Sequence, residues 1–295
     1  MTTLSNRYEF VLLYDVENGN PNGDPDAGNM PRIDPETGYG IVTDVCLKRK
    51  IRNYVEMATG DKPSYKIYIK ENVPLNTQHK EAYVATGTAV PTNDNERKAI
   101  RNNVAKIQEL RQWMCANFFD IRAFGAVMNT DVPAGIVRGP IQMNFSRSID
   151  PIVQQEVTIT RLTVTEEGQD KMTEIGRKHI VPYGLYRVEG YISAKLANDP
   201  TKGTGFSEED LNLFWEALIN MFEHDRSAAR GKMATRKLVV FKHESDLGNA
   251  HAHKLFELVK VTRKPEAIPP RSFSDYEVTV DKAGVPQGVE LIEKL

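Results

Sequence analysis

The chain has 295 residues, with 38 Lys and Arg against 40 Asp and Glu, a formal net charge of −2 and 40% hydrophobic residues. A hydrophobic content near the globular average, with little net charge, excludes a largely disordered chain. The sequence contains no apolar run of the ~18 residues that a membrane-spanning helix needs, and its first ten residues do not resemble a secretory signal. We therefore expect a cytoplasmic protein with no membrane partner. Cys46 and Cys115 lie far apart in the sequence, which excludes a disulfide framework and a Cys-rich zinc site.

The near-neutral total hides a segregation of sign. Residues 1–46 carry eight acids and two bases, whereas residues 47–53 carry four bases and no acid. Residues 226–242 carry six bases without an acid. Two local basic blocks therefore lie inside an acidic-to-neutral chain, and the total charge does not exclude a nucleic-acid partner.

The first expected element is a strand at residues 7–16, where aromatic and aliphatic side chains alternate with a second, more polar set. Residues 17–42 are so rich in Gly, Pro, Asn and Asp that they predict a long loop. Loops of this length are usually functional or mobile.

A helix is expected next. Thr43 offers an N-cap and Gly60 ends the element, while apolar residues recur between them at helical spacing. At about 100° per residue the apolar stripe leaves Arg49 and Arg52 on the opposite face, with Lys48 beside them. The helix is therefore expected to bury one side and to expose a mostly basic one.

The rest of the chain mixes strands and helices without regular alternation. We expect strands at 65–69, 119–128, 139–146, 157–164, 186–193, 237–242 and 276–280, helices at 94–117, 207–224 and 249–259, and irregular structure at 74–95. Ser207 and Asp210 resemble a capping box. The polar, charged segment 165–178 is expected to be an excursion from the core. This order favours an α+β fold around an antiparallel sheet over a doubly wound fold.

The acidic loop was tested as a metal site. Counted from Asp24, the sixth position of an EF-hand would be Asn29 instead of Gly and the twelfth Pro35 instead of Glu, so the pattern fails. A metal-dependent nuclease that uses Asp24 or Asp26 stays an alternative, because carboxylates in a loop can bind Mg²⁺. Turn formation is the simpler explanation of these residues.

Other site signatures are missing or weak. His251 and His253 would lie roughly 200° apart around a helix axis, so both rings cannot face one metal. The sequence has no phosphate-binding P-loop, no nucleophile elbow and no evident Cys/His dyad, so we expect no cofactor, no metal and no enzymatic activity. Residues 122–127 match the RRM aromatic signature only in part, and Phe124 fits a core position as well as a ligand position.

The basic blocks suit phosphates. Bases on a helix whose amino end favours anions can hold a nucleic-acid backbone without reading bases, although a solvated helix face explains them too. Residues 226–232 are the stronger signal, because small residues and Gly between the bases allow a close approach of backbone.

At this point the sequence resembles the CRISPR-associated backbone subunit of type I Cascade, in the RAMP superfamily and most like the type I-C branch. The segments that carry the resemblance are RYEFVLLYDVENGNPNGDPDAGNMPR, TDVCLKRKIRNYV, FDIRAFGAV, RGPIQ and DRSAARGK, which together run through most of the chain. Residues past 269 carry little of it.

The resemblance implies one RRM-like (ferredoxin-like) palm over residues 1–295, with a fingers and web insertion near 61–118 and a β-hairpin thumb near 165–178. It implies copies stacked head to tail along a CRISPR RNA, an open assembly that a heterologous interface generates. The implied partners are the CRISPR RNA, target DNA through the guide, other copies of the chain, and the foot or cap, large and small Cascade subunits.

The resemblance and the basic blocks together give the expected site. The RNA-binding residues are Arg32, Lys48, Arg49, Arg52, Arg138, Gln142, Arg226, Arg230 and Lys232, and the thumb residues are Met172, Arg177 and Lys178. The expected function is a non-catalytic RNA-binding backbone subunit in antiviral defence. The alternative is a metal-dependent endoribonuclease of the type III backbone kind that uses Asp24 or Asp26.

Overall fold

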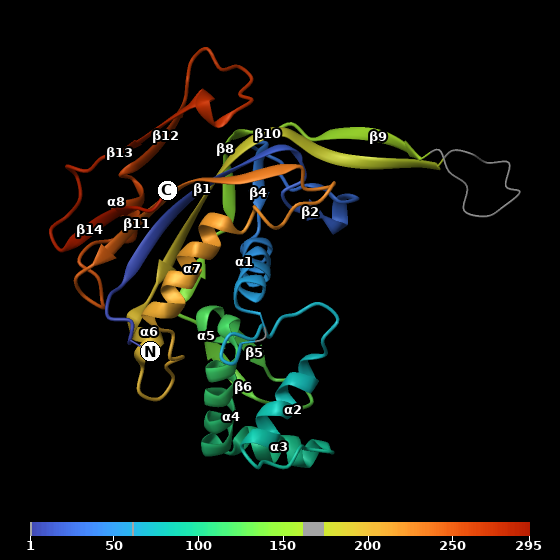
Figure 1. The fold of residues 1–295 in the computed structure, drawn as a ribbon, viewed down its shortest axis with the longest axis vertical. Coiled ribbons are helices and arrows are strands. Elements are labelled where there is room, and N and C mark those ends of the chain that lie inside the picture. The colour runs from blue at the N-terminus through green and yellow to red at the C-terminus, as the bar shows by residue number, and fades with distance from the viewer. Residues whose placement is uncertain (1, 61, 162–173) are drawn as a thin grey trace, which may run out of the picture.

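One antiparallel sheet dominates the computed structural model, which describes residues 2–60, 62–161 and 174–295. Its strand order is β14-β11-β1-β10-β8-β4, and β7 and β9 also pair with β10 (Figure 1). These strands are β1 (Tyr8–Gly19), β4 (Tyr39–Val42), β7 (Ile141–Met143), β8 (Ser146–Pro151), β9 (Gln155–Arg161), β10 (Glu174–Ile192), β11 (Lys232–His243) and β14 (Val289–Glu293). The expected α+β class with an antiparallel sheet is confirmed.

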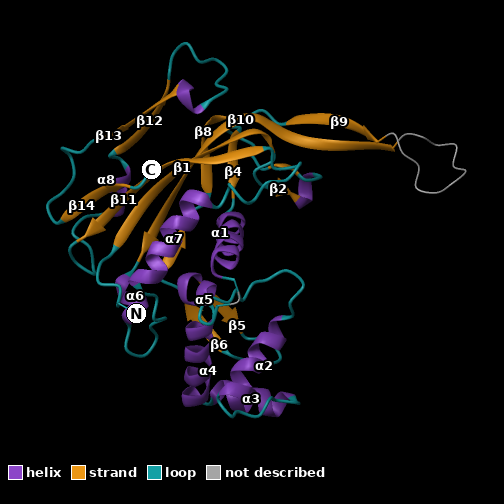
Figure 2. Ribbon diagram, viewed as in Figure 1, coloured by secondary structure: helices purple, strands orange, loops and turns teal. Residues whose placement is uncertain are grey.

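Strand β1 is central, because it pairs with β10 on one side and with β11 on the other. Phe10 and Tyr14 lie in the core cluster beneath helices α1 (Asp44–Thr59) and α7 (Glu208–Asn220) (Figure 2). Val11 and Leu13 lie in the cluster on the opposite face. That second face is covered by α8 (Ala252–Phe256) and by the pair β12 (Val259–Arg263) and β13 (Tyr276–Val280). The short helix η2 (Phe273–Asp275) lies between these two strands. The expected strand at 7–16 is confirmed and is longer than predicted.

The long loop expected at 17–42 contains short regular elements. These are β2 (Gly23–Asp24), the 3₁₀ helix η1 (Pro25–Ala27), β3 (Met30–Pro31) and β4. Because β4 pairs with β8 at the edge of the main sheet, the end of this segment belongs to the fold core rather than to a loop. These strand pairings were not predicted, because a high content of Pro and Gly is typical of loops.

Helix α1 begins after Thr43 and ends before Gly60, as predicted. The capping box of α7 is also confirmed, because the Ser207 side chain accepts from the Asp210 amide and the Asp210 side chain accepts from the Ser207 amide. Helix α7 ends at Asn220, four residues before the expected end. The helix expected at 249–259 is reduced to α8, and α6 (Ala194–Asn198) is an additional short helix.

A second lobe has its own core, built from α2 (Leu75–Ala85), α3 (Asp94–Asn102), α4 (Val104–Asn117), β5 (Gly125–Met128) and β6 (Gly135–Arg138). The irregular structure expected at 74–95 is wrong, because α2 occupies much of it. The strand expected at 65–69 is wrong as well, since only Lys66 forms an isolated bridge there. The core of this lobe continues to Val137, beyond the segment 61–118.

Two further predictions of this region are corrected. The single helix expected at 94–117 is two helices, because Asn103 accepts a hydrogen bond from the Lys106 amide (3.1 Å) and caps a new one. The strand expected at 119–128 is instead helix α5 (Phe119–Phe124) followed by β5. All six residues of α5 are buried, and a short run without exposed positions carries no periodicity that separates helix from strand.

Strands β9 and β10 form an arm that leaves the body of the molecule (Figure 1). Strand β10 pairs with β1 from Val181 onward and with β9 over residues 174–180. Of the expected thumb segment 165–178, residues 174–178 lie in β10, and Met172 lies outside the described residues. No described helix combines the length and the apolar character that a membrane crossing requires.

Replacing Arg122 by Met tests the junction between α5 and α7. The Arg122 guanidinium donates two hydrogen bonds of 2.8 Å to the Asp210 carboxylate, and both side chains are buried. Without it, Asp210 keeps a buried charge, so Arg122→Met should lower the free energy of unfolding by about 3–5 kcal/mol in urea denaturation.

The matched control is Arg97→Met. Arg97 pairs with the exposed Asp94 at 2.7 Å, and removing such a surface pair should cost ~1 kcal/mol or less. Equal losses for the two variants would show that the buried Arg122–Asp210 pair contributes no more to stability than a surface pair.

Candidate nucleic-acid interface

The basic segment 225–231 is the loop between α7 and β11, and it packs against the end of β1 (Figure 1). The Asn20 amide donates to the Ala229 carbonyl at 2.8 Å. Gly231 has φ +62°, and a Cβ at this position would lie 2.4 Å from the Asn18 carbonyl oxygen. The small residues of this loop therefore permit a close approach by the chain's own backbone. From the sequence, we expected them to permit a close approach by the backbone of a ligand.

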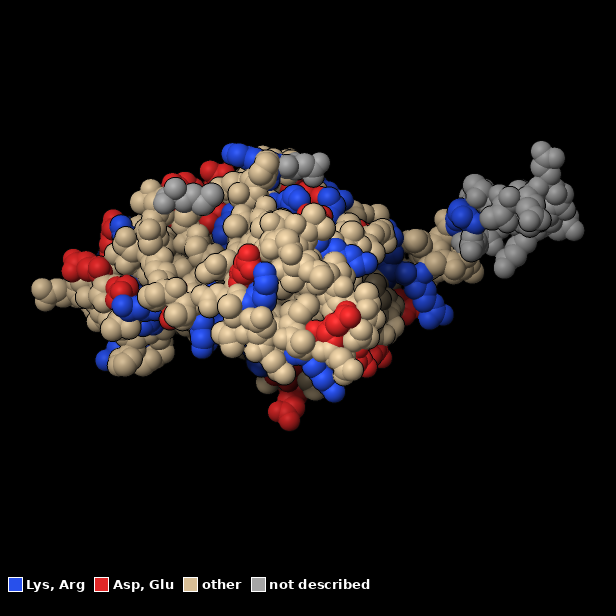
Figure 3. Space-filling view, turned by 90° about the horizontal axis from the view of Figure 1, so that it is seen from below, with Lys and Arg blue, Asp and Glu red and all other residues tan. Residues whose placement is uncertain are grey.

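The base of the arm reaches the same loop. Lys178, on β10, donates from Nζ to the Ala228 carbonyl at 3.2 Å. Lys and Arg side chains gather on the face shown in Figure 3, where the arm leaves the body. Lys178 and the loop bases, which the sequence could not place relative to one another, are thus brought together.

Helix α1 contacts this loop through the buried carboxylate of Asp225. Asp225 pairs with Lys50 through Oδ2 and with Arg230 through Oδ1. The side chains of Lys50 and Asp225 are only 2% and 6% exposed, whereas Arg230 is 38% exposed. Burial lowers the pKa of Lys50 to about 8, and nearby Arg230 acts in the same direction while Cys46 opposes it.

Cys46, in the first turn of α1, lies within the electrostatic influence of three bases. Burial raises the pKa of its thiol, and the charges of Lys50, Arg230 and Arg32 oppose that rise. The contacts show that Lys50 of α1 and Arg230 of the loop after α7 meet at Asp225. The charge of Arg32, from the segment before β4, also acts on the Cys46 thiol.

The exposed basic face expected on α1 is corrected. Arg52 is buried, and its Nε donates to Asp120 Oδ2 at 2.7 Å. Lys48 is mostly buried and pairs with Asp44 at 2.7 Å, and Arg49 donates to the Ile69 carbonyl at 2.7 Å. The helical projection missed these contacts, because their partners come from α5 and from residues of the second lobe as well as from α1 itself.

Most of the other expected cations also have acidic partners. The pairs are Arg32 with Asp24 (3.3 Å), Arg226 with Glu223 (2.6 Å), Lys232 with Glu17 (2.9 Å) and Arg177 with Glu156 (3.3 Å). All four pairs are partly or largely exposed. Pairs of this kind contribute little to stability and exchange readily, so their cations can turn to a phosphate.

Arg138 and Gln142 lie on a different part of the surface. Arg138 is exposed on β6 and has no acidic partner within the described residues, while Gln142 is exposed on β7 and donates to the Gly139 carbonyl at 3.1 Å. The ring of the nearby helix residue Phe124 has Lys48 Nζ at 5.5 Å and Arg52 at 5.4 Å from its centre. Phe124 is buried, and its helical setting in α5 corrects the strand platform that the RRM comparison considered.

The carboxylates of the nuclease alternative have local partners. Asp24 accepts the Asp26 amide at 3.2 Å as the N-cap of η1, and it also pairs with Arg32. Across residues 2–60, 62–161 and 174–295, no three His, Cys, Asp or Glu side chains converge as a metal site. The expected separation of His251 and His253 around a helix axis is wrong: α8 begins at Ala252, and the two rings are stacked with centroids 5.8 Å apart.

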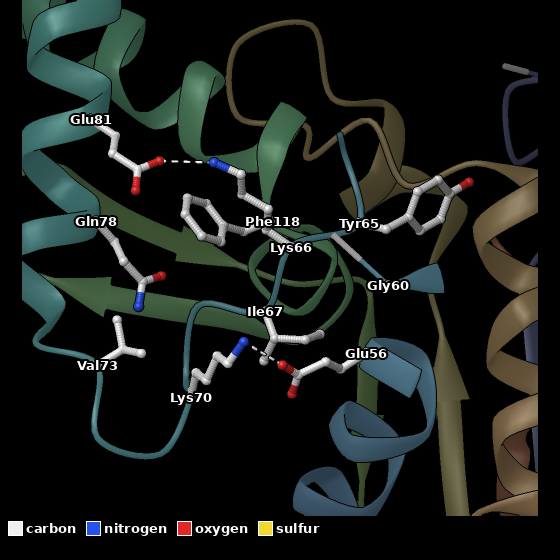
Figure 4. A pocket seen from close by; sticks show the side chains of 10 residues that line it. All are labelled: Glu56, Gly60, Tyr65, Lys66, Ile67, Lys70, Val73, Gln78, Glu81 and Phe118. Carbon is white, nitrogen blue, oxygen red and sulfur yellow. Dashed lines mark hydrogen bonds and ion pairs between the residues drawn. The ribbon is translucent and has the colours of Figure 1, made fainter. Parts of the chain in front are cut away.

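A cavity of about 200 Å³ lies between the end of α1, residues 65–73 and α2 (Figure 4). Lys66 pairs with Glu81 at 2.9 Å and Lys70 pairs with Glu56 at its rim. Because each lysine faces an acid, the rim has no surplus charge for an anion.

Two central residues of the site, Lys50 and Asp225, were not predicted from the sequence. Lys50 was counted in the basic block but was not placed on a face, although it lies three residues after Leu47 and four before Tyr54 and thus on the apolar stripe. Asp225 was not considered, because nothing in the sequence relates it to Lys50 across 175 residues. The spacing of Lys50 from Leu47 and Tyr54 could have predicted its burial.

The family model of the CRISPR-associated protein Cas7 matches residues 6–281. The chain belongs to the Cas7 family. A Cas7 relative from Haloferax volcanii is 27% identical over 279 residues, which cover 88% of this chain and 76% of the relative.

Two solved structures are also similar to the chain. One, a "CRISPR RNA-guided surveillance complex, pre-nicking", has a TM-score of 0.48 and 13% identity, covering 80% of this chain and 78% of that one. The other, a "CRISPR RNA-guided surveillance complex", has a TM-score of 0.45 and 12% identity, with coverages of 80% and 68%. The match of the family model confirms the resemblance seen in the sequence, at the level of the Cas7 family.

Gly231→Ala tests the contact between the loop and β1. A methyl group there meets the Asn18 carbonyl, so the loop must move, and we expect the free energy of unfolding to fall by more than about 2 kcal/mol. The control Gly28→Ala has nearly the same φ, +61°, but open space around its Cβ, so it should lose only ~1 kcal/mol. Chemical denaturation measures both, and equal losses would rule out the steric contact.

Proposed function

We propose that the chain is a non-catalytic RNA-binding backbone subunit of a type I Cascade complex, of the type I-C kind, that stacks in several copies along the guide RNA. Its membership of the Cas7 family supports this proposal. The observation that supports it most directly is the convergence of Lys178, Arg230 and Lys50 of α1 on the loop 225–231.

The chemistry of this surface favours phosphate contact over base recognition. The cations that a ligand can reach here are Lys and Arg side chains on the loop and on strands β10 and β11, and such groups position a backbone without selecting sequence. A guide-binding subunit needs this property, because base pairing between guide and target supplies the sequence specificity. The surface suits guides of any sequence.

The remaining parts of the molecule take their roles from the same proposal. The main sheet serves as an RRM-like palm, the second lobe as fingers, and the β9–β10 arm as the thumb that reaches a neighbouring copy. The partners are the CRISPR RNA, target DNA through the guide, further copies head to tail, and the foot or cap, large and small subunits. The proposed location is the cytoplasm, and Arg138 and Gln142 are proposed as further backbone contacts.

Salt dependence tests the phosphate surface. Arg226→Ala with Lys232→Ala removes two exposed cations that belong only to surface ion pairs, so the fold should persist. Each lost phosphate contact should flatten the dependence of log affinity on log salt by about 0.7 for a single strand, giving a combined loss of about 1.4. Binding should weaken equally for RNAs of different sequence.

Lys195→Ala with Lys282→Ala is the matched control, because both lysines are exposed and paired with acids elsewhere on the protein. Its salt dependence should equal that of the wild type. If the control lowers the slope as much as the test variant does, the loop 225–231 is not the interface.

Co-purification tests the function itself. The chain expressed with a CRISPR locus should carry small RNA into the purified particle, and RNA-free protein would contradict the proposal. The same preparation is incubated with Mg²⁺. Cleavage that Asp24→Ala abolishes would replace the proposal by the nuclease alternative.

A further inference from the structure

The carboxylate of Asp225 lies between two cations of unequal exposure. Lys50 contacts its Oδ2 from inside the protein, and Arg230 contacts its Oδ1 from the surface. With 2% of its side chain exposed, Lys50 cannot touch a bound RNA, whereas Arg230 can. The three groups together carry one net positive charge.

This surplus distinguishes the site from its neighbours. Lys48 with Asp44, Arg52 with Asp120 and the loop's own Arg226 with Glu223 each sum to zero. At Asp225 a second cation is added from the interior. If Lys50 were neutral, Arg230 and Asp225 would cancel as well. Because Asp225 is only 6% exposed, that pair would not exchange with a phosphate as the exposed Arg226–Glu223 pair can.

Stability alone does not require this arrangement. A buried lysine is costly to desolvate, and a buried ion pair is commonly matched or exceeded in stability by apolar residues of similar volume. The surroundings of Lys50 would suit such a residue, since its Nζ lies 5.8 Å from the centre of the Phe222 ring and its neighbours Leu47 and Ile51 are fully buried.

We propose that Lys50 is a positioning residue for RNA binding: it holds and neutralises Asp225, so that Arg230 presents an uncompensated charge to a phosphodiester of single-stranded RNA. The inference rests on the proposed function and deepens it. Lys50 acts through Asp225, which it fixes, and Arg230 makes the contact. The buried lysine thereby sets the charge of a surface that it does not reach.

Two isosteric neutral substitutions test this role by rescue. Lys50→Met should flatten the dependence of log affinity on log salt by about 0.7, as the loss of one phosphate contact does, although residue 50 cannot meet the RNA. Adding Asp225→Asn removes the carboxylate, leaves the charge of Arg230 uncompensated and should return the slope to the wild-type value. Lys195→Met, at an exposed surface pair, should change nothing.

The outcomes separate the inference from the proposed function. A wild-type slope in Lys50→Met, or a double variant that stays as low as Lys50→Met, overturns the role of Lys50 and leaves the proposed function standing. If Lys50→Met does not fold, the folded double variant decides: a wild-type slope supports the role, and a slope lower by about 0.7 overturns it. A wild type that binds no RNA overturns the proposed function, and the inference with it.

Discussion

The continuity of strand β10 is the constraint on which the site depends. One strand pairs with β1 from Val181 to Ile192 and with β9 over residues 174–180, so the sheet and the arm share a single backbone. The direction of the arm is therefore fixed by the register of the central sheet. Lys178 lies where β10 passes from one partner to the other, and its bond to the Ala228 carbonyl connects that point to the basic loop. The sheet core thus places the arm base, the loop and the end of β1 together.

Charge compensation is the second feature of this surface. Nearly all of the expected RNA-binding cations face an acid or a carbonyl of the same chain, which keeps a dense basic surface from repelling itself before a ligand binds. In the proposed function, a phosphate would compete with these carboxylates for cations that are already in place. The net charge of −2 is consistent with such a surface, because most of these bases have a nearby acid and the net charge does not show where the charges lie.

The sequence predicted the elements whose signals are local. Alternation identified β1, Thr43 and Gly60 bounded α1, and the Ser207 capping box marked α7. Contacts that join distant segments were not predictable from the sequence. Asp120 pairs with Arg52, and Asp225 pairs with Lys50 and Arg230, so residues far along the chain determine which bases of α1 are exposed. The prediction for α5 was wrong for another reason. All of its residues are buried, so no alternation of polar and apolar residues distinguishes a helix from a strand there. Candidate cations could thus be identified from sequence, whereas their partners could not.

The most direct test of this account is ultraviolet crosslinking of the particle assembled in cells with its CRISPR locus, followed by mass spectrometry of the RNA-linked peptides. A surface built from the base of the arm and the loop after α7 predicts crosslinks in residues 174–178 and 225–232. RNA-linked peptides confined to the β12–β13 pair, which covers the opposite face of the sheet, would contradict it.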